Sequence, residues 1–187
     1  MTQSPGAARA DTETEMTAHH IIFARHAQAA PEAWGGLDRN RPLTERGQLD
    51  AEHLAHAIAA LDIALAGTHL WHSTATRTSQ TAASIAACLP SSRVVLGLDA
   101  LYDLDLYGML ELIRETPGSV RTLIIVGHNP VIAEICRHLA SDAIDGPIAR
   151  ELMKGFEPAT AAMFAVASDW AGLSPNTATL GAVLPPG

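Results

Sequence analysis

Apolar residues in this chain follow two alternating patterns: short continuous runs, and positions spaced for one face of a helix. Continuous runs of about 4–8 residues are typical of buried strands, whereas apolar positions three and four apart indicate a helix. The first pattern predicts strands over residues 19–24, 69–72, 94–96 and 121–126, with closing strands near 161–167 and 177–183. The second predicts helices that begin after Thr44, over 73–88, over 107–115 and after Pro130.

The alternation of strands and helices predicts the fold class. It indicates an α/β protein with three α/β/α layers, in which helices cover both faces of a mostly parallel sheet. Residues 18–187 are expected to form a single domain, because 187 residues fit one. Residues 1–17 are small, polar and acidic, and we expect a loosely held N-terminal tail. Ligands of such sheets bind beyond the carboxyl ends of the strands, so the loops there are the candidate sites.

Composition and charge narrow the range of partners. Hydrophobic residues make up 48% and charged residues 17%, as in a globular protein. The formal net charge of -8 argues against a nucleic-acid groove and an anionic membrane surface, which both favour basic patches. The first 17 residues lack the apolar centre of a secretory signal, and no run of about 18 apolar residues is present. We therefore expect a cytoplasmic protein that binds neither nucleic acid nor membrane.

Three of the predicted strands end in cationic or imidazole side chains. The first ends in Arg25 and His26, the second ends in Ser73 with Arg77 four residues later, and the 121–126 strand is followed by His128. Arginine is rarely buried without a partner and prefers forked contacts to phosphate or carboxylate. Two arginines and two histidines at one edge of the sheet therefore indicate a site for a phosphoryl group.

The same residues suggest the chemistry. The chain has neither a G-x-S-x-G elbow nor a Walker loop, and Cys88 and Cys136 lie in helical runs, where we expect small buried side chains. Histidine is therefore the expected nucleophile, since a neutral imidazole nitrogen can attack phosphorus and form a phosphoenzyme. Arg25, Arg77 and His128 would then hold the phosphoryl oxygens, with contributions of about 10²–10³ each in rate.

Four segments resemble motifs of the histidine phosphatase superfamily, which includes the phosphoglycerate mutases. They occur in family order and read ARHAQ at 24–28, RPLTERG at 41–47, STATRTSQT at 73–81 and VGHNP at 126–130. The short length and the RPLT segment are most similar to the SixA-type branch, whose named activity is phosphohistidine phosphatase. The resemblance implies a phosphoglycerate-mutase-like fold and no metal or cofactor. It implies His26 as the nucleophile, and Arg25, Arg77 and His128 as the phosphate pocket.

The resemblance is incomplete at several positions. Ala27 replaces the usual glycine, and Gln28 begins a pair that replaces a charged residue and a hydroxyl residue. The glutamate acid of the mutase branch has no clear counterpart; Asp103, with Asp99 and Asp105 beside it, is the candidate acid. Gln28 and Arg41 are candidates for the rim of the pocket, and Arg41 has the alternative role of pairing with Asp38 or Glu45 to shape its loop.

The expected function is hydrolysis of a phosphate monoester or a phosphoramidate, with a phosphorylated small molecule or a phosphohistidine protein as substrate. Three alternatives stay open: a phosphomutase, a non-catalytic phosphate-dependent binding module and, less favoured because of the arginines, a metal-dependent hydrolase. His53 and His56 are spaced for a metal on a helix but suit an exposed face better. His72 is a further rim candidate, and the tryptophans Trp34, Trp71 and Trp170 are expected to serve packing.

Overall fold

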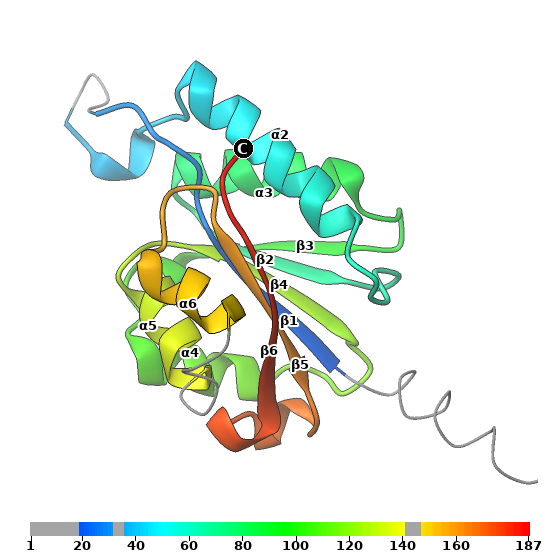
Figure 1. Ribbon diagram of the computed structural model, residues 1–187. Helices are drawn as coiled ribbons and strands as arrows, with labels where there is room; N and C mark the ends of the chain where they lie inside the picture. The colour runs from blue at the N-terminus through cyan, green and yellow to red at the C-terminus, as the bar shows by residue number, and fades with distance from the viewer. Residues whose placement is uncertain (1–18, 32–35, 141–146) are drawn as a thin grey trace, which may run out of the picture.

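The computed structural model of the protein describes residues 19–31, 36–140 and 147–187 (Figure 1). The predicted tail over 1–17 and Trp34 lie outside these residues. The helices and strands, in chain order, are β1 His19–Arg25, η1 Asp38–Asn40, α2 Glu45–Ala59, β2 His69–Ser73, α3 Thr76–Cys88, β3 Val94–Leu98, η2 Asp99–Tyr102, α4 Leu106–Arg114, β4 Thr122–Gly127, α5 Val131–Leu139, α6 Pro147–Lys154, β5 Ala161–Val166, η4 Trp170–Gly172, η5 Pro175–Thr177 and β6 Ala178–Leu184.

The strands form one six-stranded sheet in the order β3-β2-β4-β1-β5-β6. β1, β4, β2 and β3 are paired in parallel, whereas β5 is antiparallel to both β1 and β6. The sheet is therefore mostly parallel, as predicted. The carboxyl ends of β1, β2 and β4 lie at one edge, and the antiparallel β5 begins at that same edge.

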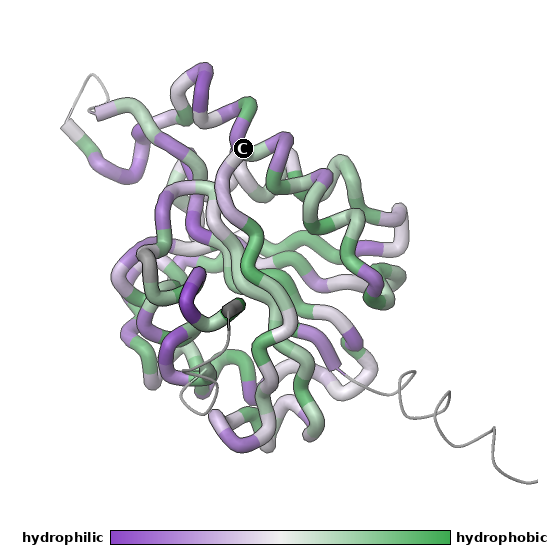
Figure 2. Tube along the Cα trace, in the orientation of Figure 1, coloured by the Kyte–Doolittle hydropathy of each residue, from purple (hydrophilic) through white to green (hydrophobic). Residues whose placement is uncertain are grey.

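Helices cover both faces of the sheet, which confirms the three-layer arrangement. α2 and α3 lie on one side of the sheet, and α4, α5 and α6 lie on the other (Figure 1). The alternation of side chains in β4 explains this, because Leu123 and Ile125 pack into one core while Ile124 and Val126 pack into the other. Figure 2 accordingly shows hydrophobic positions along the central strands, with hydrophilic positions recurring along α2.

Local signals in the sequence account for where the site-bearing helices begin. Thr44 caps α2, since its hydroxyl oxygen accepts a hydrogen bond from the Gly47 backbone at 2.9 Å. Ser73 is the last residue of β2, and α3 begins three residues later, so Arg77 lies in its first turn. Pro130 directly precedes α5, and the Asn129–Pro130 peptide is cis.

Two elements differ from the sequence prediction. Helix α6 was not predicted; it buries only Ala149 and Leu152 among its described side chains, so its apolar pattern is short. The short strand predicted at 94–96 is β3, and its apolar residues Val94, Val95 and Leu96 are exposed at the edge of the sheet. Trp71 and Trp170 are buried in the core, as expected. Within the described residues, no helix is long and apolar enough to cross a membrane.

Candidate active site

His26 follows the last residue of the central strand β1 and is half-buried. Its Nδ1 lies 2.8 Å from the carbonyl oxygen of Ala27 and therefore carries the proton that it donates. Nε2 is then the nitrogen with the free electron pair, and it accepts a hydrogen bond from Arg77 Nε at 3.3 Å. Burial, together with the charges of Arg77, Arg25 and Arg41, lowers the pKa of His26 to about 4, although its bond to Ala27 acts in the opposite direction. The imidazole is therefore neutral at pH 7, as a nucleophile must be.

Arg77 lies at the centre of the site, and its guanidinium offers two forked edges. The Nε–NH2 edge faces two imidazoles, because Nε donates to His26 and NH2 lies 3.3 Å from Nδ1 of His128. The opposite edge faces Asp38: NH1 donates to its backbone oxygen and NH2 to its carboxylate Oδ2, both at 2.7 Å. Only 7% of the Arg77 side chain is exposed, so its orientation is fixed by these partners.

His128 directly follows β4 and faces His26 across the site, with the ring centroids 5.2 Å apart. Its Nδ1 accepts from Arg77, so Nε2 carries the proton and donates to Oγ of Ser73 at 3.0 Å. Burial first, and then the charges of Arg77 and His26, lower the pKa of His128 to about 3. Ser73, predicted only as the end of its strand, thus orients the second imidazole.

Arg25 is the last residue of β1, and its NH1 donates to the carbonyl oxygen of Phe156 at 2.7 Å. Nδ2 of Asn129 donates to the same oxygen at 3.0 Å. Nε of Arg25 is buried and has no hydrogen-bond partner among the described residues. The charge of Arg25 lowers the pKa of both His26 and His128, which indicates that it acts on the same site.

Motif residues outside the pocket hold the loop that follows His26. The backbone N–H of Ala27 donates to Oγ1 of Thr81, the last residue of the STATRTSQT segment, at 3.1 Å. The loop then pairs with the RPLTERG segment, since the backbone N–H of Thr44 donates to the Gln28 carbonyl at 3.0 Å. A Cβ on Gly47 would lie 2.1 Å from that same carbonyl oxygen, so only glycine permits the approach.

Asp38 and Tyr102 also contact the centre, although the sequence did not predict a place for them there. Besides its contacts to Arg77, the Asp38 carboxylate accepts from Arg41 NH1 and from the Tyr102 hydroxyl, each at 2.8 Å. These bonds, with Arg41 contributing most, hold the pKa of Asp38 well below its usual range. The spacing of Asp38 three residues before Arg41 was the available signal, but it predicted only the pairing of those two residues.

The remaining predicted residues lie around this centre. Arg41 pairs with Asp38, which is the structural role that its alternative reading gave it. Gln28 accepts from the Thr44 hydroxyl at 3.0 Å, so its side chain is tied to the start of α2. Nδ1 of His72 lies 2.8 Å from the Ser73 carbonyl oxygen and 3.3 Å from Ser79 Oγ.

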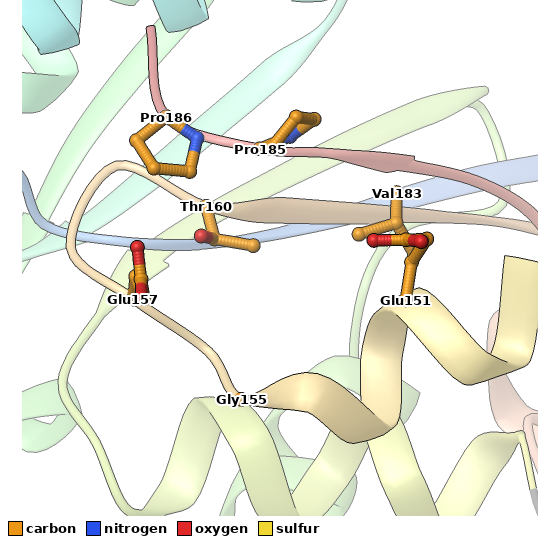
Figure 3. Close-up of a pocket in the computed structure, with 7 residues that line it drawn as sticks. All are labelled: Glu151, Gly155, Glu157, Thr160, Val183, Pro185 and Pro186. Atoms are coloured by element: carbon orange, nitrogen blue, oxygen red, sulfur yellow. The ribbon is translucent and has the colours of Figure 1, made fainter.

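One cavity adjoins the centre, and another lies away from it. One, of about 180 Å³, reaches His128 and is lined also by Tyr102, Asp103, Leu104, Val131 and others from the η2–α4 and β4–α5 segments. The predicted acid Asp103 is exposed at this cavity. The second cavity, of about 320 Å³, lies between α6 and the end of β6, where Glu151 and Glu157 face Val183, Pro185 and Pro186 (Figure 3).

The described residues contain no group of three or more His, Cys, Asp or Glu side chains placed to hold a metal ion. His53 and His56 are exposed on α2, and Nδ1 of His56 bonds to the Glu52 backbone oxygen at 2.9 Å. The centre instead gathers arginine and imidazole donors, and such a donor set fits an oxyanion.

The chain is similar in sequence to known proteins. The model of the family described as "Histidine phosphatase superfamily (branch 1)" matches residues 21–105. An uncharacterized protein of Mycobacterium tuberculosis is 32% identical over 167 residues, which cover 83% of this chain and 95% of the relative.

Solved structures extend the agreement to the fold. A SixA-type protein of Nakamurella multipartitia, named for a suggested phosphohistidine phosphatase activity, is 26% identical with a TM-score of 0.76, over 90% of this chain and 96% of that one. A similarly named SixA protein of Agrobacterium tumefaciens, 24% identical, shares the fold with a TM-score of 0.74 over 90% of this chain and 98% of that one. The chain therefore belongs to the histidine phosphatase superfamily, in its SixA-type branch.

Proposed function

We propose that this protein is a phosphatase that hydrolyses a phosphate monoester or a phosphoramidate through a covalent phosphohistidine on His26. The observation that carries the proposal is the pairing of one guanidinium edge with two neutral imidazoles. Arg77 donates to Nε2 of His26 and to Nδ1 of His128, so both imidazoles meet at the same edge of the guanidinium. A phosphoryl group bound to the Arg77 edge would have the electron pair of His26 Nε2 beside its phosphorus.

The reaction has two displacements. In the first, the Nε2 electron pair attacks phosphorus, a P–N bond to His26 forms, and the bond from phosphorus to the leaving group breaks with its electrons. In the second, a water oxygen attacks the phosphohistidine, the P–N bond breaks, and its electron pair returns to Nε2. The water proton passes to solvent or to the departing phosphate. Arg25, Arg77 and His128 bind the phosphoryl oxygens and stabilise the charge that they carry in each transition state.

The leaving group bears on the substrate class. The cavity beside His128 gives it room, and Asp103 is the candidate acid at that cavity. An alkoxide leaves poorly without a proton, whereas the imidazole of a phosphohistidine needs less help. The related SixA proteins are named for phosphohistidine, which makes a phosphohistidine on a partner protein the first substrate to test. Replacing Asp103 by Asn should slow an alkyl phosphate more than a phosphoramidate if Asp103 is the acid.

The chemistry needs no metal, because the arginines supply the positive charge that a divalent cation would otherwise provide. Arg25 and Arg77 beside the histidines would also repel such a cation. A cytoplasmic location remains our expectation for a protein of this kind.

Trapping the phosphoenzyme tests the proposal. The protein is mixed with a ³²P-labelled phosphohistidine protein and, separately, with p-nitrophenyl phosphate, and is quenched in alkali, which preserves phosphohistidine. We expect label on the wild-type chain, on a peptide that contains His26, together with release of free phosphate. The His26→Ala variant should carry no label and show no measurable turnover.

His56→Ala is the matched control, since it removes an exposed imidazole from α2 and should leave both readouts unchanged. Near-normal turnover by His26→Ala would exclude His26 as the nucleophile. Bound phosphoprotein without any trapped label or free phosphate would favour a binding module instead. Transfer of label to a second position of the substrate, without free phosphate, would indicate a mutase.

A further inference from the structure

Arg77 is held from outside the pocket by a residue that neither the motifs nor the proposed mechanism uses. The backbone oxygen and the carboxylate Oδ2 of Asp38 accept from NH1 and NH2, both at 2.7 Å. These two acceptors occupy the guanidinium edge that faces away from the histidines. We propose that Asp38 is the positioning residue that fixes the fork of Arg77 in the orientation that receives the phosphoryl group; this inference rests on the proposed function.

Asp38 is suited to this task because its own position is fixed by other segments. Its Oδ1 accepts from Arg41 NH1, and its Oδ2 also accepts from the Tyr102 hydroxyl, each at 2.8 Å. The next residue in the chain, Arg39, places its guanidinium 4.5 Å from the centre of the Tyr102 ring and pairs with Asp99 at 3.0 Å. The η1 turn that carries Asp38 is thereby attached to the η2 turn.

The contacts distinguish a positioning role from that of a proton donor. A general acid must hold a proton near neutral pH. Arg41, Tyr102 and Arg77 all donate to the Asp38 carboxylate, and together they keep the pKa of this group well below its usual range. Asp38 therefore stays an anion that accepts hydrogen bonds, and it acts on the reaction through Arg77.

Exposure makes the inference testable without unfolding the protein. Half of the Asp38 side chain is exposed, whereas 7% of the Arg77 side chain is. Removing the carboxylate opens no cavity in the core, but it takes the Asp38 acceptor away from NH2 of Arg77 and leaves only the backbone oxygen on that edge. A reacting group displaced by about 1 Å can lose about 100-fold in rate, so the loss is expected in kcat more than in KM.

A double-mutant cycle tests whether Asp38 acts through Arg77. The full chain is prepared as wild type, Asp38→Ala, Arg77→Ala and the double variant, and each is assayed for kcat and KM with p-nitrophenyl phosphate. We expect Asp38→Ala to lower kcat/KM about 10- to 100-fold in the wild type and less than about 2-fold in the Arg77→Ala background. Calorimetric titration of the same four proteins with orthovanadate measures the coupling between Asp38 and Arg77 from binding affinity, independently of turnover. Asp38→Asn keeps an acceptor oxygen for NH2 and should recover part of the loss.

Asp62→Asn is the control, because it neutralises an exposed carboxylate at the opposite edge of the sheet and should change neither rate nor affinity. Wild-type activity in Asp38→Ala overturns the inference. An equal loss of activity and vanadate affinity in both Arg77 backgrounds also overturns it, since Asp38 would then act elsewhere. Either result leaves the proposed function standing if His26→Ala is still inactive, whereas an active His26→Ala variant removes the proposed function itself.

Discussion

Gly47 and Gln28 approach each other so closely that a Cβ on Gly47 would fall 2.1 Å from the Gln28 carbonyl oxygen. The atom that blocks the Cβ belongs to the backbone of the loop that follows His26, so it cannot rotate away. The first turn of α2 therefore determines where this loop runs.

Gly47→Ala should destabilise the protein, because the loop or the helix must move to admit the methyl group. Overpacking of this kind costs about 1–3 kcal/mol, which lowers Tm by about 2–12 °C in a domain of this size. The decrease in Tm is measured by thermal unfolding monitored by circular dichroism. Gly118→Ala is the control, since a Cβ there meets nothing within 4 Å. Equal Tm values for the two variants would contradict the prediction.

Thr81→Val should slow turnover and lower stability, although it conserves side-chain shape. It removes the acceptor of the Ala27 N–H, and an unsatisfied buried donor costs about 1–3 kcal/mol. Thr81→Ser, which restores the hydroxyl, should recover most of both losses. Paired measurements of kcat and Tm check this, and failure of serine to recover either one would show that the hydroxyl is not the cause.

Arg77→Lys should reduce kcat/KM by about 10²–10³, because it keeps the charge but loses the forked edge that faces the two histidines. Steady-state kinetics with p-nitrophenyl phosphate measure the reduction. The same substitution at Arg137, which is exposed on α5, provides the control. A small effect at Arg77 would mean that charge alone, and not geometry, determines the rate.

The ring of His26 should stay neutral in mildly acidic solution. Burial and the nearby arginines lower its pKa from 6.5 to about 4. Between pH 6.5 and 4, a histidine in the unfolded chain takes up a proton, whereas His26 in the folded chain does not. The stability that His26 contributes is therefore complete above pH 6.5 and is lost as the pH falls toward 4. A pH titration of the imidazole resonances by NMR, assigned with the His26→Gln variant, should give a midpoint near 4 for the protein without ligand. A midpoint near 6.5 would contradict it.

The sequence predicted well what depends on continuous apolar runs. The run in β4 places Gly127 and His128 at a strand end, and the run in β1 does the same for Arg25 and His26. Since parallel strands share one carboxyl edge, these residues had to lie near one another. The helical spacing after Pro130 was equally informative, because Ile132, Ile135, Cys136 and Leu139 are all buried.

The sequence could not predict what depends on the shape of irregular segments. Asp38 and Tyr102 lie in short 3-10 turns that have no periodic pattern, and their contact joins positions 64 residues apart. The exposure of Val95 could not be predicted, because a run of apolar residues does not reveal whether its strand is central or at the edge. The direction of β5 likewise depends on the turn that precedes it.

The turn that precedes β5 limits how far the chain can be shortened. Because β5 runs antiparallel to β1, the segment leading into it crosses the site and supplies the Phe156 carbonyl that anchors Arg25. The recognisable motifs all end by residue 130. A chain truncated there would lack the Phe156 carbonyl that binds the Arg25 guanidinium, and it would lack strand β5 beside β1. The segment before β5 thus fixes Arg25, and a shortened chain that keeps this contact must extend through β5.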